Sequence, residues 1–303
     1  MRRKVVLIGP LSDFTMSYTA EVLVKHKVAF DFIDTPTLIS NGALSYNPQK
    51  GLVEITARSK THVLDQNTNL FYRQMDVSPA APSEELKQRA IAIQSHLSLG
   101  INCLQGTVLN KPIAMRYNTS KLFHMATTTL KHIKMPPSLC STCPDEVRIF
   151  FEKHDGKVIV KGSSSFKTKA ALVSKDDFEK RMHLLPQSPP LFQRQIEGIE
   201  LRVHCVGSQA FAEIIAARDV DYRFLRNRRH IATLNYELDA VLLDEVRSIV
   251  NQLGLGFAGI DLKFDEKSGN WYFLEANPMP CYHGYDFRSK GQISNALVER
   301  LVS

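Results

Sequence analysis

The segment GFAGIDLKFDEKSGNWYFLEANP near the C-terminus constrains the fold most, because it predicts a two-stranded hairpin with polar residues inside its second strand. Residues 257–264 and 270–276 are rich in apolar and aromatic side chains, and the polar residues 265–269 between them predict a turn. Residues i and i+2 of a strand point to the same face. Glu275 and Asn277 therefore project together.

The register of this hairpin decides whether Asp261 joins them. Pairing Phe264 with Trp271 puts Asp261 opposite Leu274, one residue away from Glu275. The register must shift by one residue, or a bulge must intervene, for three oxygen-bearing side chains to meet. Without such a shift, the carboxylates are an ordinary acidic pair on the solvent face of a hairpin.

The candidate metal ligands are thus Asp261, Glu275 and Asn277. Two carboxylates and an amide oxygen suit a hard cation that keeps waters and binds phosphate, which indicates Mg²⁺. Pro278 follows directly and ends the second strand, because proline cannot donate to a ladder.

Composition is typical of a soluble globular enzyme with more than one domain. The chain has 303 residues, 44% hydrophobic and 23% charged, and single cores stop growing near that length. No run of about 18 apolar residues predicts a membrane span. The short apolar stretch after the basic start predicts a first strand rather than a signal peptide. We expect a cytoplasmic protein with no membrane partner.

The charge balance favours anionic partners. Lys and Arg number 38 against 31 Asp and Glu, a net charge of +7, which suits nucleotide, phosphate or an acidic peptide. The arginine–aromatic interleaving of nucleic-acid-binding proteins is missing, so no nucleic acid is expected. The sequence leaves a homo-oligomer open.

The five cysteines, an odd number, fit a reducing compartment better than a disulfide scaffold. Cys140 and Cys143 match CxxC, but no second pair or zinc-type His cluster accompanies them. We interpret them as part of a loop after two prolines, with a redox dithiol as the alternative. The role of Cys281 is open.

The alternation of elements predicts three domains, of which the first covers residues 1–115. Its opening order of strand, helix and strand indicates a small parallel α/β unit. The elements expected here are a strand over 4–9, a helix over 17–27, a strand over 28–34, a hairpin over 43–60, a strand over 70–73 and a helix from the N-cap Ser83 to about residue 99.

The second domain, residues 116–190, and the third, residues 191–303, are expected to be α+β. In the second we expect a helix from 121 to about 133 capped near Ser120, a strand over 157–161, a Ser-rich loop over 162–168, a strand over 169–173 and a helix after Ser174. In the third we expect strands over 191–196, 200–206 and 210–216, a helix with apolar residues from Leu242 to Leu253 that stops at Gly254, and the hairpin.

Two lysines are candidates for phosphate binding. Lys161 ends an apolar strand and precedes small residues, including Ser163 and Ser164, whose backbone N–H groups can approach phosphate. The segment is not a P-loop. Lys121 lies in the first turn of a helix, where the dipole favours anions, so another duty such as reaching phosphate would explain it. The alternative is an exposed surface lysine, which is the default interpretation for Lys161 and an equal one for Lys121.

The end of the strand over 191–196 offers backbone groups for an adenine edge. The candidates in this stretch are Gln193, Arg194, Gln195 and Ile196 for adenine and Glu200 for ribose hydroxyls, with Arg202 on the same face as Glu200. Farther on, five arginines including Arg223 form a basic stretch over 218–229. This stretch is either a solvated loop or a set of guanidinium forks for an acyl phosphate or an acidic substrate.

Taken in order, these elements resemble the ATP-grasp superfamily, most of all its branch of the ribosomal-protein glutamate ligase and the graspetide (microviridin-type) peptide-maturing ligases. The resemblance covers roughly residues 70–300. The matching residues are Asn110-Lys111-Pro112, Asn118 with Lys121, Lys161, Gln193 through Arg202, Asp221-Tyr222-Arg223, Gly259-Ile260-Asp261, and Phe273 through Pro278.

The resemblance implies an ATP-grasp fold with ATP between the second and third domains. It implies that the ATP phosphates are bound by Lys121, Lys161, Ser163 and Ser164, and that adenine is bound by Gln193, Arg194, Gln195 and Ile196, with Glu200 near ribose. It implies that two Mg²⁺ ions, for which Mn²⁺ can substitute, are held by Asp261, Glu275 and Asn277. The catalytic residues implied are Arg202 and Arg223, which would stabilise an acyl phosphate. The family usually has an acid where this chain has Arg194.

The reaction implied is ATP-dependent ligation of a carboxylate to an amine or a hydroxyl through an acyl phosphate, with ADP as product. A peptide, a protein or an amino acid would be the substrate, and an acidic peptide suits the net charge. Two alternatives stay open: a small-molecule kinase of the inositol-polyphosphate-kinase type, and a non-catalytic ATP-binding module.

Overall fold

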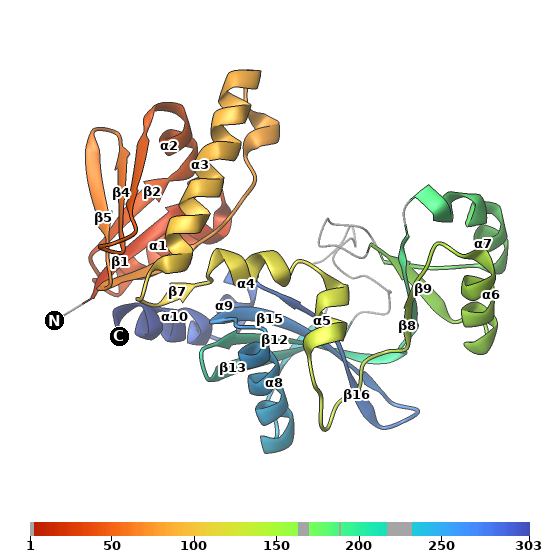
Figure 1. Ribbon diagram of the computed structural model, residues 1–303. Coiled ribbons are helices and arrows are strands. Elements are labelled where there is room, and N and C mark those ends of the chain that lie inside the picture. Colours follow the sequence, from red (N-terminus) through yellow and green to blue (C-terminus); the bar gives the residue numbers. More distant parts are fainter. Residues whose placement is uncertain (1–2, 163–169, 188, 217–231) are drawn as a thin grey trace.

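The computed structural model describes residues 3–162, 170–187, 189–216 and 232–303, which form a mixed α/β fold (Figure 1). The N-terminal sheet is parallel, as the sequence predicts, because a crossover helix joins its first two strands. Its strands, in the order β2-β1-β6-β7, are β1 (Lys4–Gly9), β2 (Phe30–Asp34), β6 (Thr68–Tyr72) and β7 (Val108–Leu109).

The crossover helix α1 (Phe14–Lys25) begins three residues before the predicted start. The carboxylate of Asp13 accepts a hydrogen bond from the Met16 N–H and so caps the helix. The predicted cap Ser83 is confirmed, since its hydroxyl accepts the Leu86 N–H at the start of α3 (Glu84–Cys103).

The predicted hairpin over 43–60 is a three-stranded antiparallel sheet, because a further strand follows the second turn. It is made of β3 (Ala43–Asn47), β4 (Leu52–Ala57) and β5 (Lys60–Leu64). Three short helical elements complete this part of the chain: α2 (Thr35–Asn41), the 3₁₀ helix η1 (Ser78–Ala80) and α4 (Pro112–Tyr117).

The helix predicted over 121–133 forms, but the predicted end is wrong, because α5 spans only Lys121–Thr127. Tertiary acceptors compete for the backbone beyond it. The buried carboxylate of Glu245 accepts the N–H groups of Lys131 and His132, both at 2.9 Å. These bonds hold the segment in a non-helical course toward the central sheet.

The central sheet lies at the right of Figure 1 and has the order β10-β9-β11-β8. Its strands are β8 (Ser138–Cys140), β9 (Val158–Lys161), β10 (Ala171–Leu172) and β11 (Leu191–Arg194), accompanied by α6 (Pro144–Lys153), α7 (Lys175–Arg181) and the 3₁₀ helix η2 (Met182–Gln187). Ser174 caps α7 as predicted. The strand predicted over 169–173 is shorter, and β11 belongs to this sheet although it follows residue 190.

The C-terminal sheet is antiparallel, with the order β14-β13-β12-β15-β16. Its strands are β12 (Gly198–Val206), β13 (Gln209–Ala216), β14 (Ala232–Tyr236), β15 (Phe257–Asp265) and β16 (Asn270–Asn277), and the helices of this part are α8 (Ala240–Gln252), α9 (His283–Arg288) and α10 (Gln292–Val302). The apolar stripe of α8 packs on one face of the sheet against residues such as Leu201 and Val203. Side chains between them, such as Arg202, therefore point to the opposite face.

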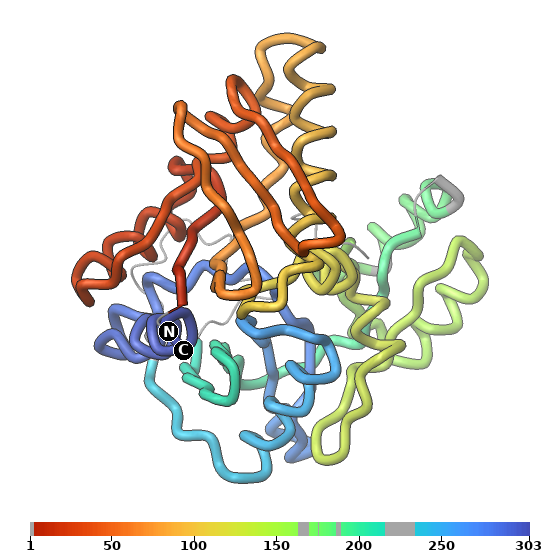
Figure 2. The backbone as a smooth tube through the Cα atoms, turned by 60° about the vertical axis from the view of Figure 1, so that its left-hand side comes forward, coloured from red at the N-terminus to blue at the C-terminus, as the bar shows by residue number. Residues whose placement is uncertain are grey.

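One core joins the two ends of the chain. Side chains of α10 and Tyr282 pack with β1, β6 and α1 in a single buried cluster. The first strand, β1, and the last helix, α10, accordingly lie near each other in Figure 2. In the described residues, no helix has the length and apolarity needed to cross a membrane.

Substituting Glu245→Gln is expected to lower the free energy of unfolding by ~1–3 kcal/mol, because an amide NH₂ group would then face a buried backbone donor. Urea unfolding measures the change. Asp244→Asn on the same helix is the control, since the Asp244 side chain is 78% exposed. Equal stabilities of the two variants would contradict the role given to Glu245.

Candidate functional site

The hairpin of β15 and β16 contains the predicted register shift. Phe264 pairs with Trp271 as expected, and the register shifts between Asp261 and Leu262. Asp261 consequently pairs with Glu275, and both carboxylates project from the same face of the sheet. The predicted meeting of the two acids is confirmed.

The pairing continues this row across the sheet. Arg202 on β12 lies directly opposite Asp261 on one side and Glu213 of β13 on the other. The four side chains Glu213, Arg202, Asp261 and Glu275 thus stand on neighbouring strands of one face, away from α8. We call this set the charged row.

Each acid of the charged row contacts a cation. The contacts are Arg288 Nε to Glu213 Oε1 at 2.5 Å, Arg202 Nη1 to Asp261 Oδ1 at 2.7 Å, and Lys121 Nζ to Glu275 Oε2 at 3.1 Å. The Arg202–Asp261 pair is buried, so removing either partner would leave an uncompensated charge in the fold. The row thus places acidic and basic side chains next to one another on one face of the sheet.

Gly259 makes room for the guanidinium of Arg202. A β-carbon at position 259 would overlap the guanidinium, which lies against the Gly259 backbone. This close approach explains why a glycine stands two residues before Asp261 on the same face.

The two predicted phosphate lysines lie on different elements, a helix and a strand, and one of them contacts Glu275. Lys121 in the first turn of α5 reaches its carboxylate directly. Lys161 at the end of β9 is buried and donates to Gln193 Oε1 at 2.8 Å, and Gln193 in turn donates to Ser138 Oγ at 2.9 Å. The ammonium groups of both lysines are near enough to the imidazole of His124 to affect its pKa.

His124 is buried on the same helix as Lys121. Its Nε2 lies 3.1 Å from Asn118 Oδ1. Burial lowers the pKa of the His124 imidazole to about 4; Glu275 opposes this shift, and the ammonium groups of Lys121 and Lys161 add to it. His124 is neutral at pH 7.

The side chain of Arg194 contacts residues of the C-terminal hairpin. Its Nη2 donates to the Tyr272 hydroxyl at 2.9 Å, and the guanidinium lies 5.3 Å from the centre of that ring and 3.9 Å from the Asp265 carboxylate. Arg194 therefore ties the central sheet to β16.

Part of the backbone in the predicted adenine segment is hydrogen-bonded within the fold. The N–H of Arg194 donates to Pro137 O at 2.9 Å, and that of Gln195 donates to Lys157 O at 2.8 Å. Ile196 follows, with its side chain buried. Two backbone N–H groups of this segment are therefore already used within the fold.

The remaining predicted residues divide into two groups. Glu200 is half-buried on β12 and shares the face of Arg202, as its spacing predicts. Ser163, Ser164 and Arg223 lie outside the described residues.

The hairpin ligands fit Mg²⁺ in their chemistry. Asp261 and Glu275 supply carboxylate oxygens, and Asn277, on the face of Glu275, supplies an amide oxygen that also accepts the Met279 N–H at 2.8 Å. All are hard oxygen donors. In the described part of the chain, the hairpin included, three or more His, Cys, Asp or Glu side chains do not come together as a metal site, so the amide of Asn277 is needed as the third ligand.

Sequence reasoning missed three residues of this site. Glu213 could have been found as a single acid inside the otherwise apolar strand Gln209–Ala216. His124 follows Lys121 by three residues and so shares its helix face. Arg288 had no local indication, because only the packing of α9 brings it to Glu213.

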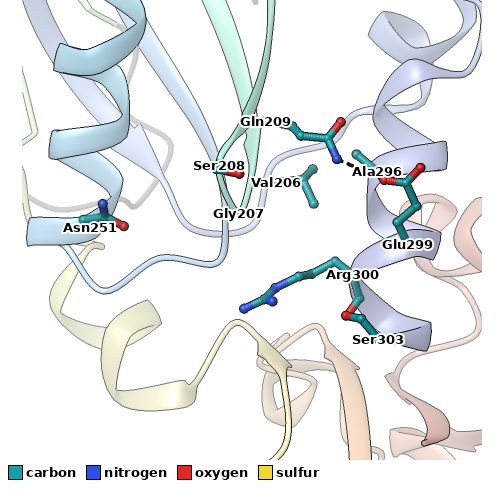
Figure 3. A pocket seen from close by; sticks show the side chains of 9 residues that line it. All are labelled: Val206, Gly207, Ser208, Gln209, Asn251, Ala296, Glu299, Arg300 and Ser303. Carbon is teal, nitrogen blue, oxygen red and sulfur yellow. Dashed lines mark hydrogen bonds between the residues drawn. The ribbon is translucent and has the colours of Figure 1, made fainter. Parts of the chain in front are cut away.

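A pocket elsewhere in the molecule contains none of these side chains. It lies between the β12–β13 turn, α8 and α10, and its polar residues include Gln209, Glu299 and Arg300 (Figure 3). Gln209 Nε2 donates to Glu299 Oε2 at 3.0 Å across one wall.

Solved structures with the same fold cover the whole chain. The macrocyclase MdnC bound with precursor peptide MdnA from Microcystis aeruginosa MRC matches with a TM-score of 0.83 and 20% identity, over 99% of each chain. ATP-grasp ligase PsnB, complexed with a phosphomimetic variant of minimal precursor, Mg and ADP, matches at 0.79 and 21%, over 98% of each chain. D-alanyl-alanine synthetase A from Vibrio cholerae O1 biovar eltor matches at 0.63 and 13%, over 99% of this chain and 98% of that one.

No protein-family model and no curated protein sequence matches the chain. The structural likeness, together with the sheet order and the charged row, defines the class: the chain has the ATP-grasp fold. The resemblance seen in the sequence is confirmed at the level of the fold.

The buried His124 predicts a pH dependence of stability. Its folded pKa of about 4 lies below the ordinary value of 6.5, so the unfolded chain binds the proton more readily. The free energy of unfolding therefore falls as the pH drops from about 6.5 to about 4, by at most ~3 kcal/mol from this group. Urea unfolding at pH 7 and pH 4.5 should show a smaller difference for His124→Gln than for the wild type.

His96→Gln is the control, because His96 is exposed on α3. A wild-type pH dependence retained in His124→Gln would show that this imidazole does not resist protonation in the fold.

Proposed function

We propose that the chain is an ATP-dependent ligase that activates a carboxylate as an acyl phosphate and transfers the acyl group to an amine or a hydroxyl. The observation that carries the proposal is the charged row, with Lys121 at its Glu275 end, within an ATP-grasp fold. A row of fixed charges of both signs suits phosphoryl transfer, where catalysis is mostly positioning and electrostatic stabilisation.

In this proposal Lys121 and Lys161 bind the phosphates of ATP. The contact of Lys121 with Glu275 and the burial of Lys161 beside Gln193 support it. Lys161 is held by Gln193, so its ammonium group is oriented before the nucleotide arrives. Ser163 and Ser164 belong to the same proposal as backbone donors, and Glu200 as the partner of ribose.

Asp261, Glu275 and Asn277 are the proposed ligands of two Mg²⁺ ions, with Mn²⁺ as a substitute. Bound Mg²⁺ neutralises charge on the phosphates of the nucleotide. Arg202 is the proposed anchor of the acyl phosphate, since its guanidinium is fixed between Asp261 and the Gly259 backbone. Arg223 has the same proposed role.

The reaction balances without a nucleophilic side chain of the protein. A carboxylate oxygen of the substrate attacks the γ-phosphorus, and ADP leaves. The amine or hydroxyl then attacks the acyl carbon, inorganic phosphate leaves, and the proton of the acceptor is released. Exclusion of water protects the acyl phosphate from hydrolysis in the interval.

A peptide or protein substrate is the proposed class. The structures of MdnC and PsnB with this fold contain precursor peptides, and the net charge of +7 favours an acidic partner. An amino acid as substrate would use the same chemistry.

Product analysis tests the proposal. ATP turnover to ADP and phosphate is expected to rise with the cognate acid, and hydroxylamine in place of the acceptor should trap a hydroxamate. AMP as product would contradict the acyl-phosphate route. Phosphate retained on a polyol would identify a kinase, and ATP binding without turnover for any acid would identify a binding module.

Loss of a residue that only orients a metal ligand typically lowers activity ~10–100-fold. Substituting Glu275→Gln removes the charge of a proposed ligand itself, so ATP turnover is expected to fall by more than this range. The melting temperature should change little. Glu266→Gln in the exposed turn of the same hairpin is the control. Turnover of Glu275→Gln equal to that of Glu266→Gln would remove the metal assignment.

Substituting Gly259→Ala is expected to lower kcat by ~10²-fold, because the added methyl group displaces the Arg202 guanidinium. Gly284→Ala is the matched control, since a β-carbon there makes only ordinary contact at 3.6 Å with Arg288. If kcat of Gly259→Ala stays at the wild-type level, Arg202 is not needed in the place where the structure holds it.

A further inference from the structure

The turn that follows β16 is held by side chains from the N-terminal part of the chain. Three consecutive backbone carbonyls, those of Pro278, Met279 and Pro280, accept hydrogen bonds from there. Asn110 Nδ2 donates to the first at 2.6 Å, and Arg73 Nη1 lies 3.2 Å and 3.4 Å from the second and third. Two side chains from the N-terminal part of the chain thus hold one short turn.

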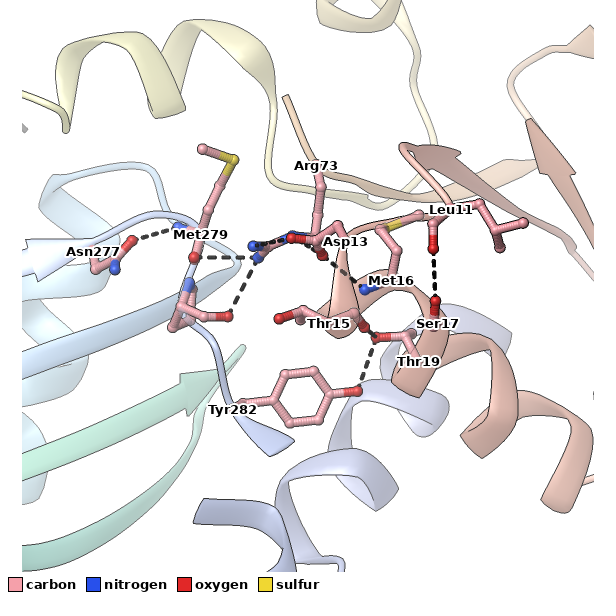
Figure 4. A network of polar contacts seen from close by, with 11 residues as sticks. Leu11, Asp13, Thr15, Met16, Ser17, Thr19, Arg73, Asn277, Met279 and Tyr282 are labelled. Carbon is pink, nitrogen blue, oxygen red and sulfur yellow. Dashed lines mark hydrogen bonds and ion pairs between the residues drawn. The ribbon is translucent and has the colours of Figure 1, made fainter. Parts of the chain in front are cut away.

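Arg73 is itself fixed in place. It follows β6 directly, and its guanidinium pairs with Asp13, with Nε to Oδ1 at 2.9 Å and Nη2 to Oδ2 at 3.2 Å (Figure 4). The two side chains are only 7% and 11% exposed. Asp13 also caps α1, so Arg73 is anchored on the N-terminal sheet and its first helix.

The turn leads directly to Asn277. Its Oδ1 accepts the N–H of Met279, whose carbonyl is one of the two that Arg73 contacts (Figure 4). The Met279 side chain packs against the core of the N-terminal sheet. Asn277 itself is exposed, so this bond and the turn behind it determine where its oxygen points.

We propose that Arg73 is a positioning residue that orients Asn277 as a metal ligand, so that the N-terminal sheet controls metal affinity in the C-terminal one. The inference rests on the proposed function. An amide oxygen carries no net charge and attracts a cation more weakly than a carboxylate does, so its contribution depends on being oriented in advance. Residues that hydrogen-bond to a metal ligand and orient it typically influence the metal affinity in this way.

Mn²⁺ affinity in the presence of a nonhydrolysable ATP analogue, measured by EPR of free Mn²⁺, tests this. Arg73→Gln is expected to weaken Mn²⁺ binding ~10-fold and to raise the Mg²⁺ concentration for half-maximal turnover. Arg89→Gln is the matched control, because Arg89 also donates to two backbone carbonyls, those of Ile39 and Gly42, far from the turn. A similar weakening in both variants would mean a general structural role and overturn the proposal.

A double-mutant cycle with Asn277→Ala separates positioning from other effects. In that background Arg73→Gln should weaken Mn²⁺ binding no further, because both changes act through the same oxygen. An additional ~10-fold loss would overturn the proposal. If Arg73→Gln does not fold, Asp13→Asn replaces it: asparagine keeps the cap of α1 but removes the charge that fixes Arg73.

The outcomes distinguish this inference from the proposed function. A wild-type chain that binds no Mn²⁺ with the nucleotide would contradict the proposed function itself. A wild-type chain that binds Mn²⁺ as tightly as Arg73→Gln does would leave the function standing and remove only the role of Arg73.

Discussion

A one-residue shift in the pairing of β15 with β16 is the constraint on which the site depends. Without it, Asp261 would face Leu274, and Glu275 would project from the other side of the sheet. With it, the two acids join Arg202 and Glu213 in one row, and Lys121 and Arg288 reach the ends of that row. A local irregularity of the backbone thus assembles charges from several strands.

The rest of the fold keeps this row in position from both sides. α8 packs on the apolar face of the sheet, so the charged face is left for other elements. Arg73 and Asn110 hold the turn after β16, and Glu245 holds the segment that leaves α5. Buried polar side chains bonded to backbone groups are costly to leave unpaired, so each fixes the course of a segment.

Much of the site was predictable because its residues carry their chemistry in local patterns. The spacing of Glu275 and Asn277, the caps Ser83 and Ser174, and the stripe of α8 follow from strand and helix periodicity. The end of α5 and the role of Arg288 did not, because each depends on a partner more than 70 residues away in sequence. The roles of all the predicted site residues stay predictions, and Ser163, Ser164 and Arg223 also lie outside the described residues.

The sequence by itself determined which residues could form a hairpin with two acids and an amide on its strands, and that a register shift was required to unite them. Whether the shift occurs, and that Arg73 and Arg288 reach the site, was decided only by the tertiary structure. The physical reason is range: periodicity acts over a few residues, whereas register and ion pairing depend on how whole sheets and helices pack.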